Sequence, residues 1–237
     1  MSDSALAEEA ANKDIAHKKA IPEQTFEQKV ADLIRFVQFE PLIRELDYKI
    51  LAWCDERRGL SDLEERIATW PEFKAATRDQ YSLVNELANH YGLEFFELDD
   101  VGDPVLEEDK AGLTENEVDD LVASFAYRTT EVGKEVVKQL DPRKRMRELL
   151  DSSSDRRAVY LAIVEFLHDK HSFADVDAFV RASGVVGLSS APGDGGVQPS
   201  VFVDKLERAG ALYYDCGWQA TEAGKDVAAD ASRSALV

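Results

Sequence analysis

The sequence has little cysteine, no long hydrophobic run and no recognisable leader. Its two cysteines, Cys54 and Cys216, lie far apart and have no CxxC partner, which argues against a disulfide framework or a cysteine-based zinc site and favours a reducing compartment. No stretch approaches the roughly 20 apolar residues of a membrane-spanning helix, and the acidic N-terminus lacks the basic and apolar regions of a secretion signal. We therefore expect a cytoplasmic protein that does not contact membranes.

Motifs that carry chemistry are also scarce. His168 and His171 have a spacing compatible with a shared metal, but the chain has only four histidines and no nearby cysteine to complete a familiar set. Cys54 is expected on the buried stripe of a helix, where a thiol packs instead of reacting. The glycine-rich segment 189–196 lacks the Lys-Ser/Thr and the preceding strand of a phosphate loop. The sequence thus predicts a non-enzymatic protein with no catalytic residue, no cofactor and no metal.

What the chain does have is acidic charge and enough apolar residues for a folded core. Its 237 residues are 44% hydrophobic and 32% charged, with a net charge of −19. This length suits two domains of ordinary size, and one large domain is the alternative. The net charge repels phosphate over a Debye length of about 8–10 Å, so DNA binding would need a local basic patch. Solubility is a second explanation for the acidity.

Hydrophobic spacing and capping residues predict the order of the elements. After an acidic arm at residues 1–24, the first half is expected to form helices, a strand at 93–98, an acidic segment, a helix opened by Thr114 and Glu117, a returning strand at 127–130 and a closing helix. Its first helices are predicted near 26–37, 43–54, 61–69 (with Ser61 and Glu64 as a capping box) and 74–90. The second half predicts helices near 156–170, 173–182 and from Pro199, a hairpin at 211–220 and a last helix.

An internal repeat links the two halves. The pattern aromatic-x-x-Thr-Glu-x-Gly-Lys-x-Val occurs at Tyr127–Val136 and again at Trp218–Val227, with identical spacing. Thr is suited to cap a helix, and Gly lets that helix approach its neighbour closely. Upstream, a Val-x-x-Leu pair followed by Gly92 parallels another followed by Gly210, with one residue of length difference. The repeat indicates a duplication.

This phrase resembles the end of the wing in bacterial winged-helix transcription regulators. The resemblance implies a mainly α protein with small β-hairpin wings, built from two winged-helix units in tandem. The expected boundaries are unit 1 at 25–140 with an acidic insertion in its wing, a basic linker at 141–154, unit 2 at 155–229 and a tail at 230–237.

In the DNA-binding members of this superfamily the third helix enters the major groove. Carried onto this sequence, the resemblance implicates one residue set on each third helix: Arg78, Gln80, Ser82 and Asn85 in the first unit, and Ser200, Lys205 and Arg208 in the second. A basic cluster of Arg143, Lys144 and Arg145 adds a candidate contact to phosphate or to an acidic partner. The alternative is a linker helix whose cations pair with the acidic units beside it.

The charges around these positions favour a protein partner over DNA. Acidic residues accompany Arg78 and Arg208, and the second wing turn at 215–217 has no cation. An exposed Val201 or Phe202 could then supply an apolar anchor. The sequence therefore predicts an interaction module or co-regulator in transcription or chromosome maintenance, with a DNA-binding transcription regulator as the alternative. A homodimer is compatible with both.

Overall fold

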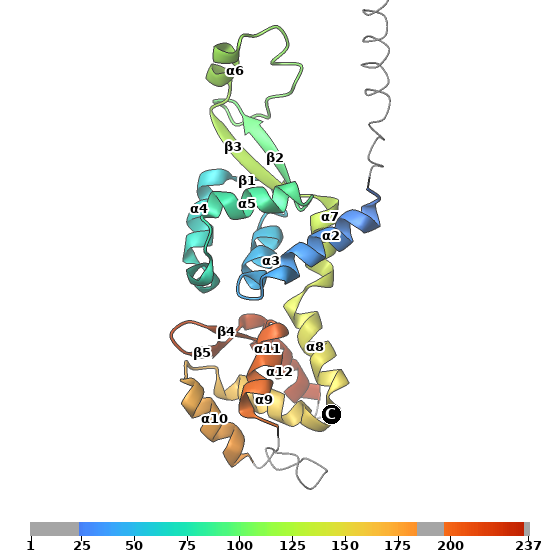
Figure 1. Cartoon of the computed structure of the whole chain (residues 1–237), viewed down its shortest axis with the longest axis vertical. Coiled ribbons are helices and arrows are strands. Elements are labelled where there is room, and N and C mark those ends of the chain that lie inside the picture. Colours follow the sequence, from blue (N-terminus) through green and yellow to red (C-terminus); the bar gives the residue numbers. More distant parts are fainter. Residues whose placement is uncertain (1–23, 184–196, 235–237) are drawn as a thin grey trace, which may run out of the picture.

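The computed structural model describes residues 24–183 and 197–234 and is mainly helical, with two small antiparallel sheets (Figure 1). Residues 1–23 of the predicted arm at 1–24, the glycine-rich segment 189–196 and the last three residues of the predicted tail lie outside these ranges.

The first half builds a three-stranded sheet among helices. The long hairpin of β2 (Leu93–Leu98) and β3 (Ser124–Thr129) projects beyond the helices, with α6 (Glu115–Leu121) near its tip (Figure 1). The elements are α2 (Phe26–Phe39), α3 (Arg44–Trp53), β1 (Arg58–Gly59), α4 (Leu60–Thr69), the 3-10 helix η1 (Pro71–Ala75), α5 (Gln80–Asn89), β2 (Leu93–Leu98), α6 (Glu115–Leu121), β3 (Ser124–Thr129) and α7 (Glu131–Gln139).

The second half repeats this order with a shorter hairpin. Its elements are α8 (Pro142–Ser152), the 3-10 helix η2 (Ser154–Arg156), α9 (Arg157–Phe166), α10 (Phe173–Ala182), α11 (Pro199–Arg208), β4 (Leu212–Tyr214), β5 (Trp218–Ala220) and α12 (Glu222–Ser234). Residues 230–234, interpreted from the sequence as part of a tail, thus belong to the last helix.

The repeated motif makes the same hydrogen bonds in both halves. Thr130 Oγ1 accepts from the backbone N–H of Gly133 at 3.0 Å and donates to the carbonyl oxygen of Tyr91 at 2.5 Å. Thr221 Oγ1 accepts from the backbone N–H of Gly224 at 3.0 Å and donates to the carbonyl oxygen of Gly210 at 2.7 Å. Each threonine therefore caps its closing helix and ties it to the segment before the hairpin.

The strand registers match as well. Phe95 lies opposite Tyr127 in the first hairpin, and Tyr214 lies opposite Trp218 in the second. A third segment also pairs with the returning strand in each half. Arg58 of β1 pairs with Tyr127, and His171 exchanges two backbone hydrogen bonds with Trp218.

The hydrogen bonds correct one detail of the predicted repeat. Thr221 ties back to Gly210 where Thr130 ties back to Tyr91, so these two residues correspond and both have a positive φ, 73° and 65°. Gly92 therefore corresponds to Ala211, not to Gly210. The predicted one-residue length difference disappears.

Several predicted boundaries were wrong for local reasons. Ser61 does not cap its helix, because α4 already begins at Leu60 with Gly59 in the cap position. The helix predicted at 74–90 is divided into η1 and α5, because Asp79 Oδ1 accepts from the backbone N–H of Ser82 at 2.7 Å and starts a new helix there.

Segment 141–154, predicted as a basic linker, is largely the helix α8 and a structural part of the second half. Met146 and Leu150 are fully buried in a cluster that extends to Ala228 of α12. The first half has a separate cluster that runs from Val30 to Leu140. In the same way that α2 packs on α7, α8 packs on α12, so each half includes a leading helix that covers its closing helix.

Candidate functional site

The exposed surface of α5 offers polar and aromatic groups instead of cations. Gln80 and Ser82 lie in its first turn, and Tyr81 between them is 51% exposed. Asn85 Oδ1 accepts a hydrogen bond from the Tyr127 hydroxyl at 2.8 Å, so this predicted contact residue helps to hold the hairpin on α5.

Arg78 precedes α5, and its charge is neutralised within the chain. Its guanidinium forms ion pairs with Glu40 and Glu86. Asp47 lies beside this group and is only 2% exposed. Burial raises the pKa of Asp47 to about 8, and the nearby charge of Arg78 offsets only part of that rise. Arg78 is thus occupied by carboxylates and does not present an unpaired charge to phosphate.

Replacing Asp47 with asparagine should stabilise the protein at alkaline pH. Asp47 keeps its proton in the folded chain up to about pH 8, whereas its ordinary pKa is 3.8. The unfolded chain therefore releases this proton first, and folding becomes less favourable as pH rises between these values. Asp47→Asn removes that loss, so we expect urea unfolding to give a gain of about 1–3 kcal/mol near pH 8 and little gain near pH 4.

The exposed carboxyl of Asp100 supplies the control. Asp100→Asn should show no comparable pH-dependent gain. An Asp47→Asn protein that is less stable than the unchanged protein at both pH values would mean that Asp47 is ionised and paired.

The surface of α11 likewise carries compensated charge. Ser200 and Val201 are exposed in its first turn, and Arg208 Nε lies 2.9 Å from Asp204 Oδ1. Lys205 forms no salt bridge within residues 24–183 and 197–234. Phe202, predicted as an exposed anchor, is buried with its ring centroid 5.5 Å from that of Tyr160. That prediction was wrong because helical spacing points Phe202 inward beside Val203.

The basic cluster also faces carboxylates, as the linker-helix alternative expects. Arg143 Nη2 is 2.5 Å from Asp226 Oδ2, and Lys144 Nζ is 4.0 Å from Glu148 Oε1. Arg145 Nη2 is 2.8 Å from Glu45 Oε2. The cluster therefore adds little net positive charge to the surface.

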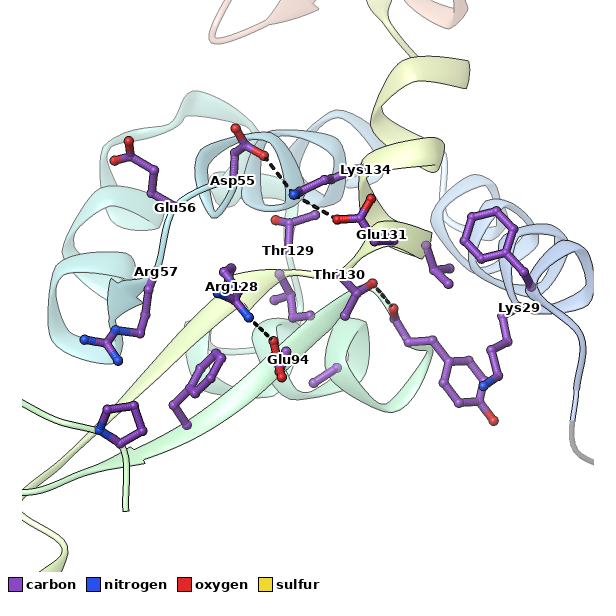
Figure 2. A pocket seen from close by; sticks show the side chains of 17 residues that line it. Lys29, Asp55, Glu56, Arg57, Glu94, Arg128, Thr129, Thr130, Glu131 and Lys134 are labelled. Atoms are coloured by element: carbon purple, nitrogen blue, oxygen red, sulfur yellow. Dashed lines mark hydrogen bonds and ion pairs between the residues drawn. The ribbon is translucent and has the colours of Figure 1, made fainter. Parts of the chain in front are cut away.

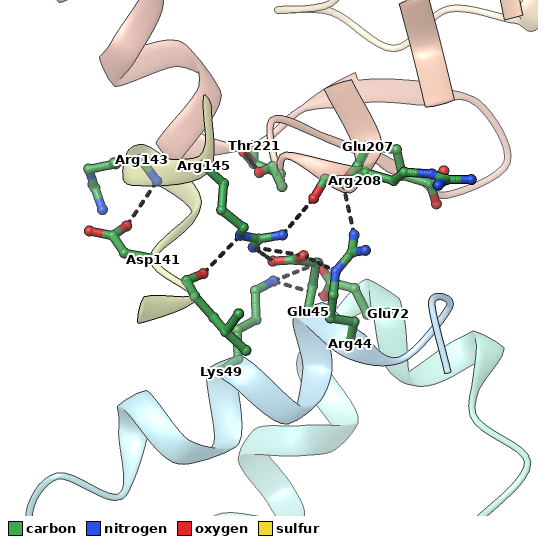
Figure 3. Close-up of polar contacts among 12 residues, drawn as sticks. Arg44, Glu45, Lys49, Glu72, Asp141, Arg143, Arg145, Glu207, Arg208 and Thr221 are labelled. Carbon is green, nitrogen blue, oxygen red and sulfur yellow. Dashed lines mark hydrogen bonds and ion pairs between the residues drawn. The ribbon is translucent and has the colours of Figure 1, made fainter. Parts of the chain in front are cut away.

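Arg145 belongs to a polar junction between the two halves, drawn in Figure 3. Its guanidinium also donates to the carbonyl oxygen of Leu140 at 2.9 Å and to that of Arg208 at 2.7 Å. Arg44 donates to the carbonyl oxygen of Glu207 at 3.1 Å. Sequence reasoning missed this junction because its partners lie up to 163 residues apart.

A second contact between the halves uses the turn of the short hairpin. Asp215 accepts from Lys74 Nζ at 2.7 Å and from Lys170 Nζ at 2.9 Å. Lys74 comes from η1 of the first half, so this turn is partly occupied by contacts within the chain.

The two cysteines differ in exposure. Cys216 of the same turn is exposed, whereas Cys54 is buried, and burial raises the pKa of its thiol to about 12.

A groove with a volume of about 1160 Å³ lies beside the base of the long hairpin, near the start of α7 (Figure 2). Its cations and carboxylates are interleaved. Arg128 Nη2 lies 2.8 Å from Glu94, and Lys134 Nζ lies 3.0 Å from Glu131. Lys29 Nζ lies 4.8 Å from the centroid of the Tyr91 ring. Because the positive and negative charges of the groove balance, it does not attract a strongly charged ligand of either sign.

The opposite face of the long hairpin carries exposed aromatic rings. Phe95 is 46% exposed and Phe125 is 41% exposed, and their ring centroids are 5.5 Å apart. Tyr127 is buried next to them, 5.4 Å from Phe95 by ring centroids. Burial, together with nearby Tyr81 and Glu64, raises the pKa of the Tyr127 hydroxyl to about 12. We call Tyr81, Phe95 and Phe125 the aromatic face.

The histidines considered as metal ligands have other neighbours. His168 Nε2 lies 3.5 Å from Glu165, and the His171 ring stacks on Phe166 with centroids 4.1 Å apart. Over residues 24–183 and 197–234, no group of three His, Cys, Asp or Glu side chains is arranged to hold a metal. None of the helices in the same ranges is both long and apolar enough to cross a membrane.

Comparisons of the chain with protein-family models, with curated proteins and with solved structures gave no match.

Proposed function

We propose that this chain consists of two winged-helix units in tandem and acts as a non-enzymatic protein-interaction module, a co-regulator in transcription or chromosome maintenance. The matched order of helices and strands supports the tandem arrangement, as do the equivalent threonine caps and strand registers. Winged-helix units serve both DNA and protein partners, so the choice rests on the surface chemistry.

One observation carries the preference for protein. Four of the cations at the candidate DNA contacts, Arg78, Arg143, Arg145 and Arg208, lie against carboxylates of the chain itself. Non-specific DNA affinity comes from cations that replace the counterions of phosphate, and paired guanidiniums contribute little to that exchange. Exposed aromatic rings are instead typical of the anchors in protein interfaces.

We expect duplex DNA to bind more weakly than about 100 μM at physiological salt. Fluorescence anisotropy with a duplex of about 20 base pairs, titrated over a range of salt concentrations, measures this. The chain should be compared with the double variant Arg143→Ala and Lys144→Ala, which removes two exposed cations of α8, and with Lys138→Ala, which removes an exposed cation of α7.

Micromolar binding with a steep salt slope would overturn the interaction-module proposal and favour the DNA-binding regulator. Loss of that binding in the double variant but not in Lys138→Ala would assign the phosphate contacts to α8.

A further inference from the structure

The aromatic face is an exposed extension of a sheet surface that is covered only at its base. Side chains at alternate positions of a strand point to the same face, so Phe95 shares its face with Tyr127 and Phe125. Near the base, α5 packs on β2 and α4 packs on β3, which buries Leu93 and Tyr127. Phe95 lies two residues beyond Leu93 on β2, and Phe125 lies two residues before Tyr127 on β3, so each is farther from the base of the hairpin. No described element covers them fully.

The surroundings of this face are acidic. Glu97 shares the face with Phe125, its partner in the strand register, and Glu64 of α4 lies near the Tyr127 hydroxyl. The insertion between the strands has ten acidic residues from Asp99 to Leu121 and a single cation, Lys110. Lys110 is held by Glu97 and Glu107. An approaching ligand therefore meets aromatic rings within a negative field.

The one cation within the strands β2 and β3, Arg128, lies on the other face of the hairpin. Arg128 alternates with Tyr127 along β3 and pairs there with Glu94. Its guanidinium carbon lies 5.2 Å from the centroid of Phe96, and that of Arg57 lies 6.0 Å from it. The two faces of the hairpin therefore differ. On one face, Arg57 and Arg128 already lie near the ring of Phe96. On the other face, Phe95 and Phe125 stack on other aromatic rings.

We propose that the aromatic face docks a basic polypeptide segment, one that presents Lys or Arg side chains together with apolar anchors. The anchors pack on Phe95, Phe125 and Tyr81, while the cations lie over the aromatic rings and against Glu64. Nucleic acid and anionic lipid carry the same sign of charge as the insertion and are repelled. This inference rests on the proposed function and specifies its partner. Because the face is small, the contact is of the weak, exchangeable class.

The test uses the full chain and a fluorescent peptide of about 16 residues, with Lys and Leu at helical spacing. Two control peptides replace all Leu by Ser or all Lys by Glu. The variant Tyr81→Ser with Phe125→Ser removes two exposed rings of the face. Phe39→Ser is the matched control, because Phe39 is 80% exposed on α2 and lies outside the face.

We expect the Lys/Leu peptide to bind with a micromolar Kd, and the double variant to bind it roughly tenfold more weakly. Phe39→Ser should bind it as the unchanged chain does, and both control peptides should bind more weakly. Equal binding by the double variant and the unchanged chain would overturn the proposal. Equal binding of the Lys/Ser peptide would also overturn it, because affinity would then follow net charge alone.

A second variant, Phe125→Lys, keeps a long side chain on β3 and places a cation on the face. Phe125→Lys should weaken binding of the Lys/Leu peptide at least as much as the double serine variant does. An unchanged circular-dichroism spectrum would show that this variant is folded. Failure of peptide binding together with absent DNA binding overturns this inference alone. Tight, salt-dependent DNA binding overturns the proposed function itself.

Discussion

A fragment of residues 155–237 should lose cooperative unfolding, whereas a fragment of residues 141–237 should keep it. The difference between them is α8, which supplies Met146 and Leu150 to the second core. Both side chains are fully buried, and removing a buried side chain of this size typically costs about 2–5 kcal/mol. Loss of the pair is therefore comparable with the whole free energy of unfolding of a small domain.

Urea unfolding monitored by circular dichroism distinguishes the two fragments. In the full chain, Leu150→Ala should be destabilising by about 2–5 kcal/mol, whereas Glu148→Ala, at an exposed position of the same helix, should change little. A cooperative transition in the 155–237 fragment would show that α8 acts as a connection and not as part of the core.

Replacing Gly133 with alanine should lower the free energy of unfolding by about 2–4 kcal/mol. A Cβ at Gly224 would lie 2.5 Å from the carbonyl oxygen of Ala211, and one at Gly133 would come still closer to that of Gly92. The neighbour is backbone in both cases and is fixed by a hydrogen bond, from Thr130 N to Gly92 O and from Thr221 N to Ala211 O. The closing helix must therefore move away from the hairpin.

Gly224→Ala should have an effect of similar size, because the repeat places it in the same contact. Gly59→Ala is the control, since the nearest atom to its added Cβ is Asp62 Oδ2 at 3.7 Å. Thermal unfolding of the three variants measures the effect. A Gly133→Ala protein as stable as Gly59→Ala would contradict the shared role of the two glycines.

The sequence predicted the elements whose ends are set by neighbouring residues. The strand at 93–98 and the helix at 173–182 have the predicted bounds, and Thr114 and Glu117 form the predicted capping box. These features depend on contacts over a few positions. The role of α8 was not predicted. Its sequence is mainly basic and has only two core residues, Met146 and Leu150, and the side chains that they pack against lie elsewhere in the chain.

The candidate site was less predictable, because charge compensation is not local. The ion pair of Arg78 with Glu40 spans 38 residues, and that of Arg145 with Glu45 spans 100. A sequence shows where cations are but not which carboxylates meet them. The alternation of Phe125 with Tyr127 indicated that both rings share one face of a strand. The exposure of Phe125 could not be predicted, because it depends on how far along the hairpin α4 and α5 pack.

The two hairpins differ in their contacts with the other half of the chain. In the short hairpin, Asp215 pairs with Lys74 of the other half of the chain, so this hairpin takes part in the contact between the halves. A ligand that competed for Asp215 would have to weaken the contact between the halves, and its binding would therefore be coupled to their relative motion. In the long hairpin, the rings of Phe95 and Phe125 contact each other and Tyr127, which belong to the same half of the chain. A ligand that bound these rings would leave the contact between Lys74 and Asp215 intact, so its binding would not be coupled to the relative motion of the halves.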